Sequence, residues 1–198
     1  MKYDEYIGAS TGYRKIEYNW RDMILYALGV GSDETELEFV YEKYLKAIPS
    51  FGTVPCFSTI NNEPRQLLPH PASEILADHI RKETDGPVNG LHMSMELLCH
   101  RPIDPIKGTL LYEDRIEKIY DWGTKGVVIV TRMPVYDEAG RLVCENISTS
   151  GYSGGGGFGG PELPKNQTRM PDREPDMVIK DRFSRIQNLL YRLSGDTN

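Results

Sequence analysis

Four strand-like runs in the middle of the chain constrain its fold more than any other feature. Each contains several apolar residues, and short segments separate them at the spacing of β-hairpins. They cover residues 91–99, 108–120, 126–136 and 141–149. Consecutive strands at this spacing predict an antiparallel sheet.

The pattern of polar residues within the runs indicates which face of the sheet is exposed to solvent. In the second run, Glu113 and Glu117 fall on one face of the strand and Ile116 falls on the other, as in a sheet with one wet face. Residues 127–130 are apolar on both faces, which predicts a central strand. Residues 137–140 form a hairpin loop in which a glycine can take the positive φ that a bulge-type turn requires.

Two helices are expected in the part of the chain that precedes these four runs. Asn19 can cap an amphipathic helix that Gly29 and Gly31 end. Residues 61–90 are polar and bear prolines, so we expect a surface excursion there, with one helix over about residues 73–81.

Two short segments between the first helix and that excursion have clear patterns. Residues 39–41 predict a brief buried strand, because they are apolar or aromatic throughout. Residues 48–55 are too rich in Pro and Gly for a long helix and predict a tight, packed turn.

A change of composition marks the domain boundary. Residues 150–160 are dominated by glycine, and a polar, proline-rich stretch follows them. We therefore expect a first domain over residues 1–160, a linker over residues 161–175, and the beginning of a second domain over residues 176–198.

The start of that second region has an apolar helical pattern. Residues 177–179 predict a short strand, and Asp181 can cap a helix that Gly195 ends. Its apolar positions share one face and are Phe183, Ile186, Leu189, Leu190 and Leu193. Burying such side chains is worth roughly 1.5–3 kcal/mol each, so we expect the helix to dock on the first domain, fray or mediate oligomerisation.

Composition excludes several classes of protein. The formal charge of −6 argues against a general nucleic-acid binder. No stretch approaches the roughly 20 apolar residues that span a bilayer, and the first residues lack a signal-peptide pattern. Three widely spaced cysteines, Cys56, Cys99 and Cys144, fit neither a disulfide framework nor a zinc site. We expect free thiols in an intracellular, cytoplasmic protein with no membrane or nucleic-acid partner.

The most specific motif is in the last nine residues, Leu-Tyr-Arg-Leu-Ser-Gly-Asp-Thr-Asn. An apolar helix runs into Gly195, and Asp196 and Asn198 follow two residues apart. This resembles the opening of the signature of MaoC-like, R-specific enoyl-CoA hydratases (hydratase 2). In that family Pro, an apolar residue, His, any residue and an acid come next; these would follow Asn198.

The resemblance extends along most of the chain in the right order. Residues 26–31 resemble the end of the family's first helix, and residues 39–42 and 50–52 its following strand and turn. Leu91-His92 and Pro175-Asp176 also have family counterparts. The glycine-rich residues 154–160, with Phe158 among them, resemble a Gly-Gly-Phe-Gly-Gly loop of the eukaryotic-type enzymes.

The resemblance implies an α+β double hot-dog, in which an antiparallel sheet wraps around a helix. The first hot-dog would shape the acyl-chain pocket and the second would carry the catalytic residues. The implied reaction is the reversible syn addition of water to a trans-2-enoyl-CoA. The substrate is the acyl-CoA thioester itself, and no metal or redox cofactor is implied. A homodimer or pairing with another hot-dog domain is expected, with a peroxisomal location in a eukaryote.

Asp196 and Asn198 match the family's catalytic Asp and its positioning Asn. Water is a poor nucleophile, so a carboxylate and a histidine must hold and deprotonate it. The developing enolate needs donors such as a backbone N–H. Because that histidine is not among the 198 residues, we expect the chain by itself to be inactive. It would be an incomplete hydratase, a half-enzyme that needs a second hot-dog chain, or a non-catalytic acyl-CoA-binding module.

Other candidate groups have ordinary alternatives. The glycine loop can cradle a pyrophosphate, which makes its members candidate substrate-binding residues, but a flexible or tightly turned linker fits its composition better. The candidates are Gly155, Gly156, Phe158 and Gly159. His92 and His100 lie in no catalytic or metal motif, so packing or surface roles are expected. Arg182, Arg185 and Arg192 could meet CoA phosphates or simply form a solvated face.

Overall fold

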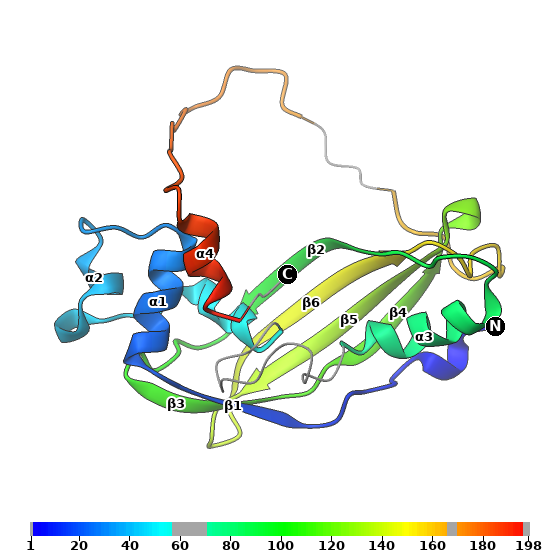
Figure 1. Ribbon diagram of the computed structural model, residues 1–198, viewed down its shortest axis with the longest axis horizontal. Helices are drawn as coiled ribbons and strands as arrows, with labels where there is room; N and C mark the ends of the chain where they lie inside the picture. The colour runs from blue at the N-terminus through cyan, green and yellow to red at the C-terminus, as the bar shows by residue number, and fades with distance from the viewer. Residues whose placement is uncertain (1, 57–70, 166–169, 196–198) are drawn as a thin grey trace.

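The computed structural model describes residues 2–56, 71–165 and 170–195 (Figure 1). A six-stranded antiparallel sheet forms its body, in the order β1-β3-β5-β6-β2, with β4 paired to β5. The strands are β1 (Arg14–Asn19), β2 (Gly90–Cys99), β3 (Lys107–Tyr112), β4 (Arg115–Asp121), β5 (Val127–Tyr136) and β6 (Leu142–Tyr152). The predicted antiparallel sheet and α+β class are confirmed. No helix in the described ranges is long and apolar enough to cross a membrane.

β5 is the central strand, as predicted. It pairs along its length with β6, and on its other side with β4 and the end of β3. Val127, Val128 and Ile129 are fully buried because both neighbours and both faces cover them. The turn between β5 and β6 is the expected hairpin loop, in which Gly140 has φ 71°.

The run over residues 108–120 is two strands and not one, so that prediction is wrong. Between β3 and β4, Asp114 turns its carboxylate into the interior and accepts a hydrogen bond from the Ala72 N–H at 2.8 Å. Glu113, expected on the wet face, is only 7% exposed; it accepts a hydrogen bond from Ser10 Oγ and pairs with Arg115. These polar partners interrupt the ladder, and apolar alternation alone does not reveal them.

Two hydrophobic clusters lie against the sheet. The first forms where α1 (Trp20–Val30) and η3 (Pro49–Cys56) meet β1, β3, β5 and β6; its buried members include Ile16, Met23, Tyr26, Phe51, Leu110 and Val135. The second forms where α3 (Ser73–Glu83) and Tyr3, beside η1 (Asp4–Tyr6), meet β4, β5 and β6; its members include Leu76, Ile80, Ile116, Ile129 and Tyr152. The two clusters together anchor every long helix to the sheet.

The ends of α1 follow the sequence signals. Asn19 Oδ1 accepts a hydrogen bond from Arg21 N at 2.9 Å, and Asp22 Oδ2 accepts one from Asn19 N at 2.8 Å. This reciprocal capping box satisfies backbone N–H groups that a helix start leaves free. The helix ends at Gly31, whose φ of 109° is the left-handed conformation favoured by glycine at this position. The predicted helix and its cap are confirmed, with Gly29 inside the last turn.

The segments between α1 and residue 56 are partly as expected. The predicted strand over residues 39–41 is wrong, because α2 (Leu37–Val40) closes through local bonds such as Tyr41 N to Leu37 O. A short 3₁₀ turn, η2 (Glu42–Tyr44), follows it. The packed turn over residues 48–55 is confirmed by η3, where Phe51 is 1% exposed.

The surface excursion predicted over residues 61–90 is wrong for its helical part. The helix is present as α3, but Leu76, Ala77 and Ile80 are fully buried. Their spacing puts three apolar side chains on one face, and that face packs on β4 and β5. Residues 57–70 lie outside the described residues. The predicted helix is therefore confirmed and its surface location corrected.

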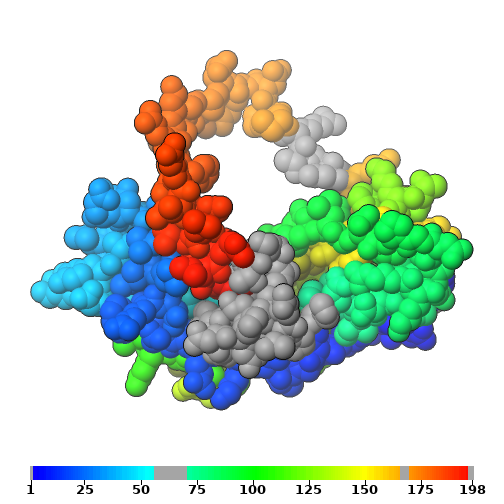
Figure 2. Space-filling model, viewed as in Figure 1, coloured from blue at the N-terminus to red at the C-terminus, as the bar shows by residue number. Residues whose placement is uncertain are grey.

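The C-terminal region is mostly extended. The helix expected from Asp181 begins later, as α4 (Gln187–Arg192), and residues 177–179 form no strand. Residues 170–186 arch away from the body (Figures 1 and 2), and Ile179 and Phe183 are 79% and 87% exposed. Helix nucleation is unfavourable and packing supplies most helical stability. Only the turns that contact α1 are helical. The helix docks on the first domain, as one of the three expected outcomes, but the prediction of which face docks is wrong. Of the five apolar positions only Leu190 is half-buried, because the face that meets α1 is the one that carries Gln187, Leu190 and Tyr191.

Candidate functional site

The glycine-rich loop is folded tightly after β6, which runs on to Tyr152. Gly155 has φ 70°, a conformation that L-residues with a Cβ rarely adopt. A Cβ at Gly156 would lie 2.1 Å from the Gly123 carbonyl oxygen, so only glycine fits there. Of the two linker forms that the sequence left open, the tightly turned one is confirmed.

Asp121, the last residue of β4, holds the loop in place. Its Oδ1 accepts hydrogen bonds from Gly123 N and Gly157 N, and its Oδ2 accepts one from Gly159 N, each at 2.8 Å. The hydrogen bond from Gly157 N is the largest cause that lowers the pKa of this carboxyl, and the other backbone donors add to it. Two of the N–H groups that a phosphate would use are therefore bound to the protein's own carboxylate.

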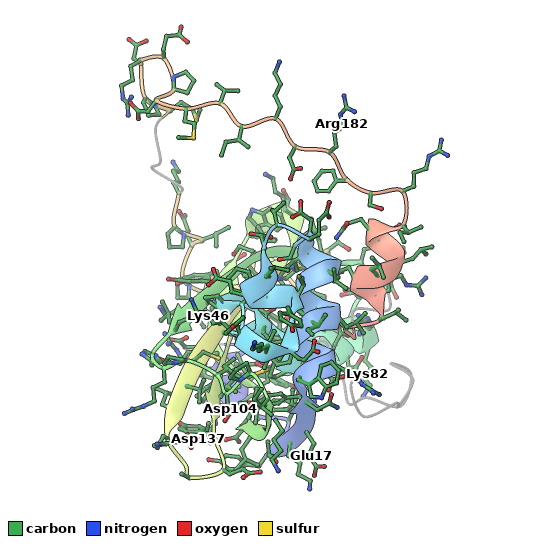
Figure 3. The ribbon with its side chains drawn as sticks, turned by 90° about the vertical axis from the view of Figure 1, so that its left-hand side faces the viewer. Glu17, Lys46, Lys82, Asp104, Asp137 and Arg182 are labelled. Atoms are coloured by element: carbon green, nitrogen blue, oxygen red, sulfur yellow. The ribbon has the colours of Figure 1, made fainter. Side chains whose placement is uncertain are left out.

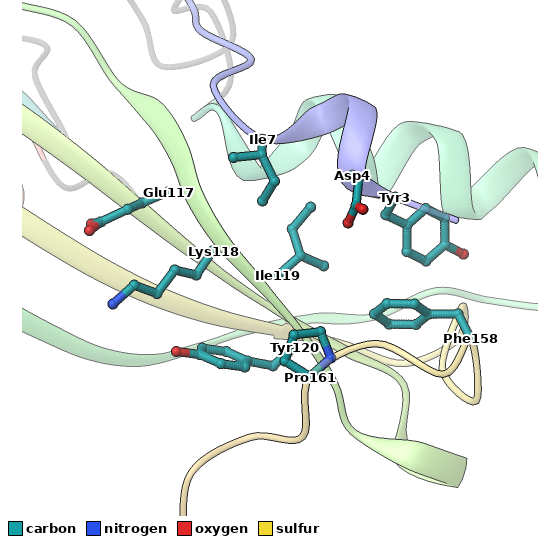
Figure 4. Close-up of a pocket in the computed structure, with 9 residues that line it drawn as sticks. All are labelled: Tyr3, Asp4, Ile7, Glu117, Lys118, Ile119, Tyr120, Phe158 and Pro161. Carbon is teal, nitrogen blue, oxygen red and sulfur yellow. The ribbon is translucent and has the colours of Figure 1, made fainter. Parts of the chain in front are cut away.

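Phe158 leaves the loop and packs on Tyr3, with ring centroids 4.9 Å apart. It lines a hollow of about 310 Å³ along β4, on the edge of this strand that faces away from β5 (Figure 4). The other lining residues are Tyr3, Asp4, Ile7, Glu117, Lys118, Ile119, Tyr120 and Pro161. Apolar side chains form most of the wall, and Glu117 and Lys118 supply charge on the β4 side. The hollow is of the size that small-molecule sites have, which is about 300–1,000 Å³.

The structure brings only one of the four glycine-loop candidates to this hollow. Phe158 lines it, whereas Gly155, Gly156 and Gly159 are outside its lining. Gly155 instead packs near Tyr3 and Ile80. The assignment of these four residues to substrate binding stays a prediction, with Phe158 best placed to contact an apolar group.

Asp196 and Asn198 lie outside the described residues, so their assignment as catalytic residues stays a prediction. The chain that leads to them is described as far as Gly195, whose φ is 118°. That chain is α4, which lies against α1 (Figure 1). The side-chain amide of Gln187 donates to the carbonyl oxygens of Leu28 and Gly29 at 2.7 and 2.6 Å.

The two singled-out histidines occupy the β2 edge of the sheet. His92 is exposed within β2. His100 Nε2 lies 2.9 Å from Glu145 Oε1, and Glu145 Oε2 accepts a hydrogen bond from Arg132 at 2.8 Å. These two contacts, the His100 contact first, hold the pKa of the Glu145 carboxyl below its usual range. The predicted surface role fits both histidines.

The cysteines described in full are thiols without a disulfide. Cys99 is exposed, and Cys144 is buried with its Sγ 3.7 Å from the Gly52 carbonyl oxygen. Burial raises the pKa of the Cys144 thiol to about 12, which keeps it protonated and unreactive. The Cys56 side chain lies outside the described part of the chain. Within that part, no group of three His, Cys, Asp or Glu residues is placed to hold a metal ion.

The candidate arginines do not converge on one site. Arg182 extends from the arch away from the body of the molecule (Figure 3). Arg192 is the last residue of α4 and is exposed, as is Arg185. A solvated role therefore fits these three residues better than a shared phosphate site.

Sequence reasoning missed two residues that organise these regions. Asp121 had a local signal, since an Asp two residues before a Gly is typical of a side chain that accepts a backbone N–H. Gln187 had a weaker one: it is the polar member of a helical face shared with Leu190 and Tyr191. Neither signal identifies the distant partner, which only the fold supplies.

Comparison with known proteins shows the family to which the chain is related. The family model described as "MFE-2 hydratase 2 N-terminal domain" matches residues 16–154. Peroxisomal multifunctional enzyme type 2 of Drosophila melanogaster is 32% identical over 189 residues, which cover 92% of this chain and 30% of that protein. The Mus musculus protein of the same name is 36% identical over 190 residues, covering 91% of this chain and 24% of that protein.

A solved structure agrees with these matches. The MaoC-like dehydratase from Phytophthora capsici superposes with a TM-score of 0.75 at 30% identity, covering 98% of this chain and 64% of that one. The chain thus spans less than a third of these two multifunctional relatives and under two thirds of the dehydratase.

Proposed function

The chain belongs to the family of MFE-2 hydratase 2 N-terminal domains and has the hot-dog fold of the MaoC-like structures, and from this premise we propose that it works in the reversible hydration of a trans-2-enoyl-CoA to an R-3-hydroxyacyl-CoA. The observation that carries the proposal is that one chain joins the matched domain to the opening of the catalytic signature. The relatives named as hydratases and dehydratases support the same reaction class.

In the proposed reaction, Asp196 and a histidine from outside these 198 residues hold a water molecule against the β-carbon. The water loses a proton to this pair as its oxygen bonds to the β-carbon. The electron pair of the double bond moves toward the thioester, and backbone N–H donors stabilise the enolate oxygen. The proton then returns to the α-carbon, so that one water molecule is added in all. Asn198 positions the reacting groups.

The first domain is proposed to receive the acyl chain. Support comes from the hollow beside Phe158, whose wall includes Ile7, Ile119 and Pro161. An apolar chain gains free energy when such surfaces exclude water, at about 25 cal/mol per Å². No cofactor is part of the proposal, because the coenzyme A thioester is itself the substrate.

A second hot-dog domain is the proposed structural partner, either in the same polypeptide or in a second copy of the chain. The support is the edge strand β2, which in the described part of the sheet pairs with β6 alone. Leu91 and Met93 on it are 65% and 39% exposed. An edge strand of this kind is a template for further pairing. Sedimentation of the chain as a stable monomer would remove the homodimer from this proposal.

Turnover measurements test the function. The full-length protein should convert crotonyl-CoA or a longer trans-2-enoyl-CoA to the R-3-hydroxyacyl-CoA, identified by chiral chromatography. The 198-residue chain alone should bind the substrate in calorimetry without turning it over. Binding without turnover by the full-length protein would instead establish the acyl-CoA-binding module, and absence of both would overturn the proposal. Recovery of activity on mixing with a separate hot-dog chain would identify a half-enzyme.

We propose a peroxisomal location, because several relatives are named as peroxisomal proteins. A fluorescent fusion of the full-length protein with a peroxisomal marker tests it, and a diffuse cytoplasmic signal would favour the other expected location.

A further inference from the structure

The face of α4 that packs on the first domain is defined by helical spacing. Gln187, Leu190, Tyr191 and Ser194 follow one another at intervals of three, one and three residues, and all four are buried or half-buried. The opposite face carries Leu189 and Leu193, which are 54% and 63% exposed. Among the described residues, α4 is therefore held through this one face.

On this face, Gln187 binds the backbone of α1. Gln187 Nε2 donates one hydrogen to the Leu28 carbonyl at 2.7 Å and the other to the Gly29 carbonyl at 2.6 Å. These carbonyls belong to the last turn of α1, where a helix leaves acceptors free; the Leu28 carbonyl also accepts a hydrogen bond from the Gly31 N–H at 3.3 Å. That turn contains no basic residue to serve them. Gln187 thus supplies one side-chain donor to each of two carbonyls at the C-terminal end of α1.

Close packing supports the same contact. A Cβ at Gly29 would lie 3.0 Å from the Tyr191 Cα, which is closer than real Cβ atoms ordinarily come. Glycine at this position lets the two helix backbones approach. The rings of Tyr26 and Tyr191 lie 6.4 Å apart beside it, within the range of aromatic pairs. Gln187 and Gly29 therefore form one latch, with a polar and a steric part.

We propose that Gln187 is a positioning residue: its side-chain amide latches α4 to the C-terminal carbonyls of α1 and so fixes how the chain enters the 195–198 signature. The proposal rests on the proposed hydratase function, because that function assigns Asp196 its role. Asp196 is the residue after Gly195, only four positions beyond the end of α4. The latch holds the described chain as far as Gly195, and small misplacements of a reacting group that follows it are costly.

The chemistry of the latch is specific to an amide. Glutamate at position 187 has the same length but no donor, and it puts a negative charge at the negative end of the α1 dipole. Methionine fills similar space without either hydrogen bond. Asn188 is the matched control, since it is exposed on the next position of the same helix. Asn188→Glu adds the same charge without touching α1.

Hydrogen exchange in the full-length protein tests the latch itself. Gln187→Glu and Gln187→Met should speed exchange of the α4 amides roughly ten-fold, because the docked face loses a doubly bonded amide. Gly29→Ala should do the same through the steric part. Asn188→Glu should leave these rates within about two-fold of the wild type. Unchanged exchange in both Gln187 variants would overturn the latch.

Kinetics on enoyl-CoA test the positioning role. Gln187→Glu should lower kcat about 10- to 100-fold while KM stays within about two-fold, because substrate binding does not depend on the signature's orientation. Loss of folded protein would also lower the apparent kcat. Active-site titration corrects for this, because it counts only the active molecules. Faster exchange with unchanged kcat would overturn the positioning role. A wild type that turns over no enoyl-CoA would refute the proposed function and the positioning role together, while exchange still decides on the latch.

Discussion

The glycine-rich loop and the C-terminal arch (residues 170–186) differ from what their compositions suggest: the loop is held in place, whereas the arch is exposed. Residues 153–160 are mostly glycine, yet Asp121 and Phe158 fix the loop on the body. The helical pattern predicted from Asp181 includes residues 181–186, yet these residues are not helical and are exposed. The loop has partners within reach, and the arch has none until α4 meets α1. Composition sets what a segment can do, and available partners decide whether it becomes ordered.

The largest expected effect comes from two matched phenylalanines. Phe158→Ala should lower the free energy of unfolding by about 2–3 kcal/mol, because the ring packs on Tyr3 in the second cluster. Phe183→Ala should change it by less than about 0.5 kcal/mol, since that side chain is 87% exposed. Urea titrations of both variants measure the difference. Equal losses would mean that the arch packs on something in solution and would break the comparison.

Substitutions of two neighbouring glycines, Gly156 and Gly157, test how tightly the loop is packed. Gly156→Ala should destabilise the fold by about 1–3 kcal/mol, because its Cβ would meet the Gly123 and Gly126 carbonyl oxygens. Gly157→Ala meets no atom within 4 Å and bears only the strain of its positive φ, which is about 1 kcal/mol. Thermal unfolding of the two variants ranks them. A larger loss at Gly157 would contradict the packed loop.

A smaller effect, on the pH dependence of stability, is expected from Asp114, whose buried carboxyl accepts a hydrogen bond from Ala72 N just before α3. Burial raises the pKa of Asp114 above its ordinary value, against the hydrogen bond from Ala72 N. The folded state therefore binds the proton more tightly than the unfolded state. Stability from this group is present below the unfolded pKa of about 4 and is lost as pH rises through the folded pKa.

Asp114→Asn should flatten that dependence by about 1 kcal/mol, because the amide oxygen still accepts the Ala72 hydrogen bond without titrating. Urea unfolding between about pH 4 and 7 compares the variant with the wild type. An unaltered pH slope would show that Asp114 does not titrate differently on folding.

The same contrast explains what the sequence could predict. The four runs that contain β2 to β6, the Asn19 cap and the presence of a helix at α3 follow from local spacing and turn chemistry, whereas β1 and the burial of α3 were not predicted. The break at Asp114, the anchor at Asp121 and the Gln187 contact depend on partners distant in the chain. The start of α4 could not be found from its pattern, because the pattern continues through residues that have nothing to pack against. The site was predicted only through the resemblance, and Asp196 and Asn198 stay predictions.

The most direct test of the account is the kcat of the full-length protein with Asp196→Asn. Asp176→Asn is the matched control, since that aspartate lies in the arch, is paired with Arg173 and is exposed. The account predicts that Asp196→Asn lowers kcat on a trans-2-enoyl-CoA by about 10²- to 10⁴-fold with KM little changed, and that Asp176→Asn keeps wild-type turnover. Wild-type kcat in the Asp196 variant would contradict it.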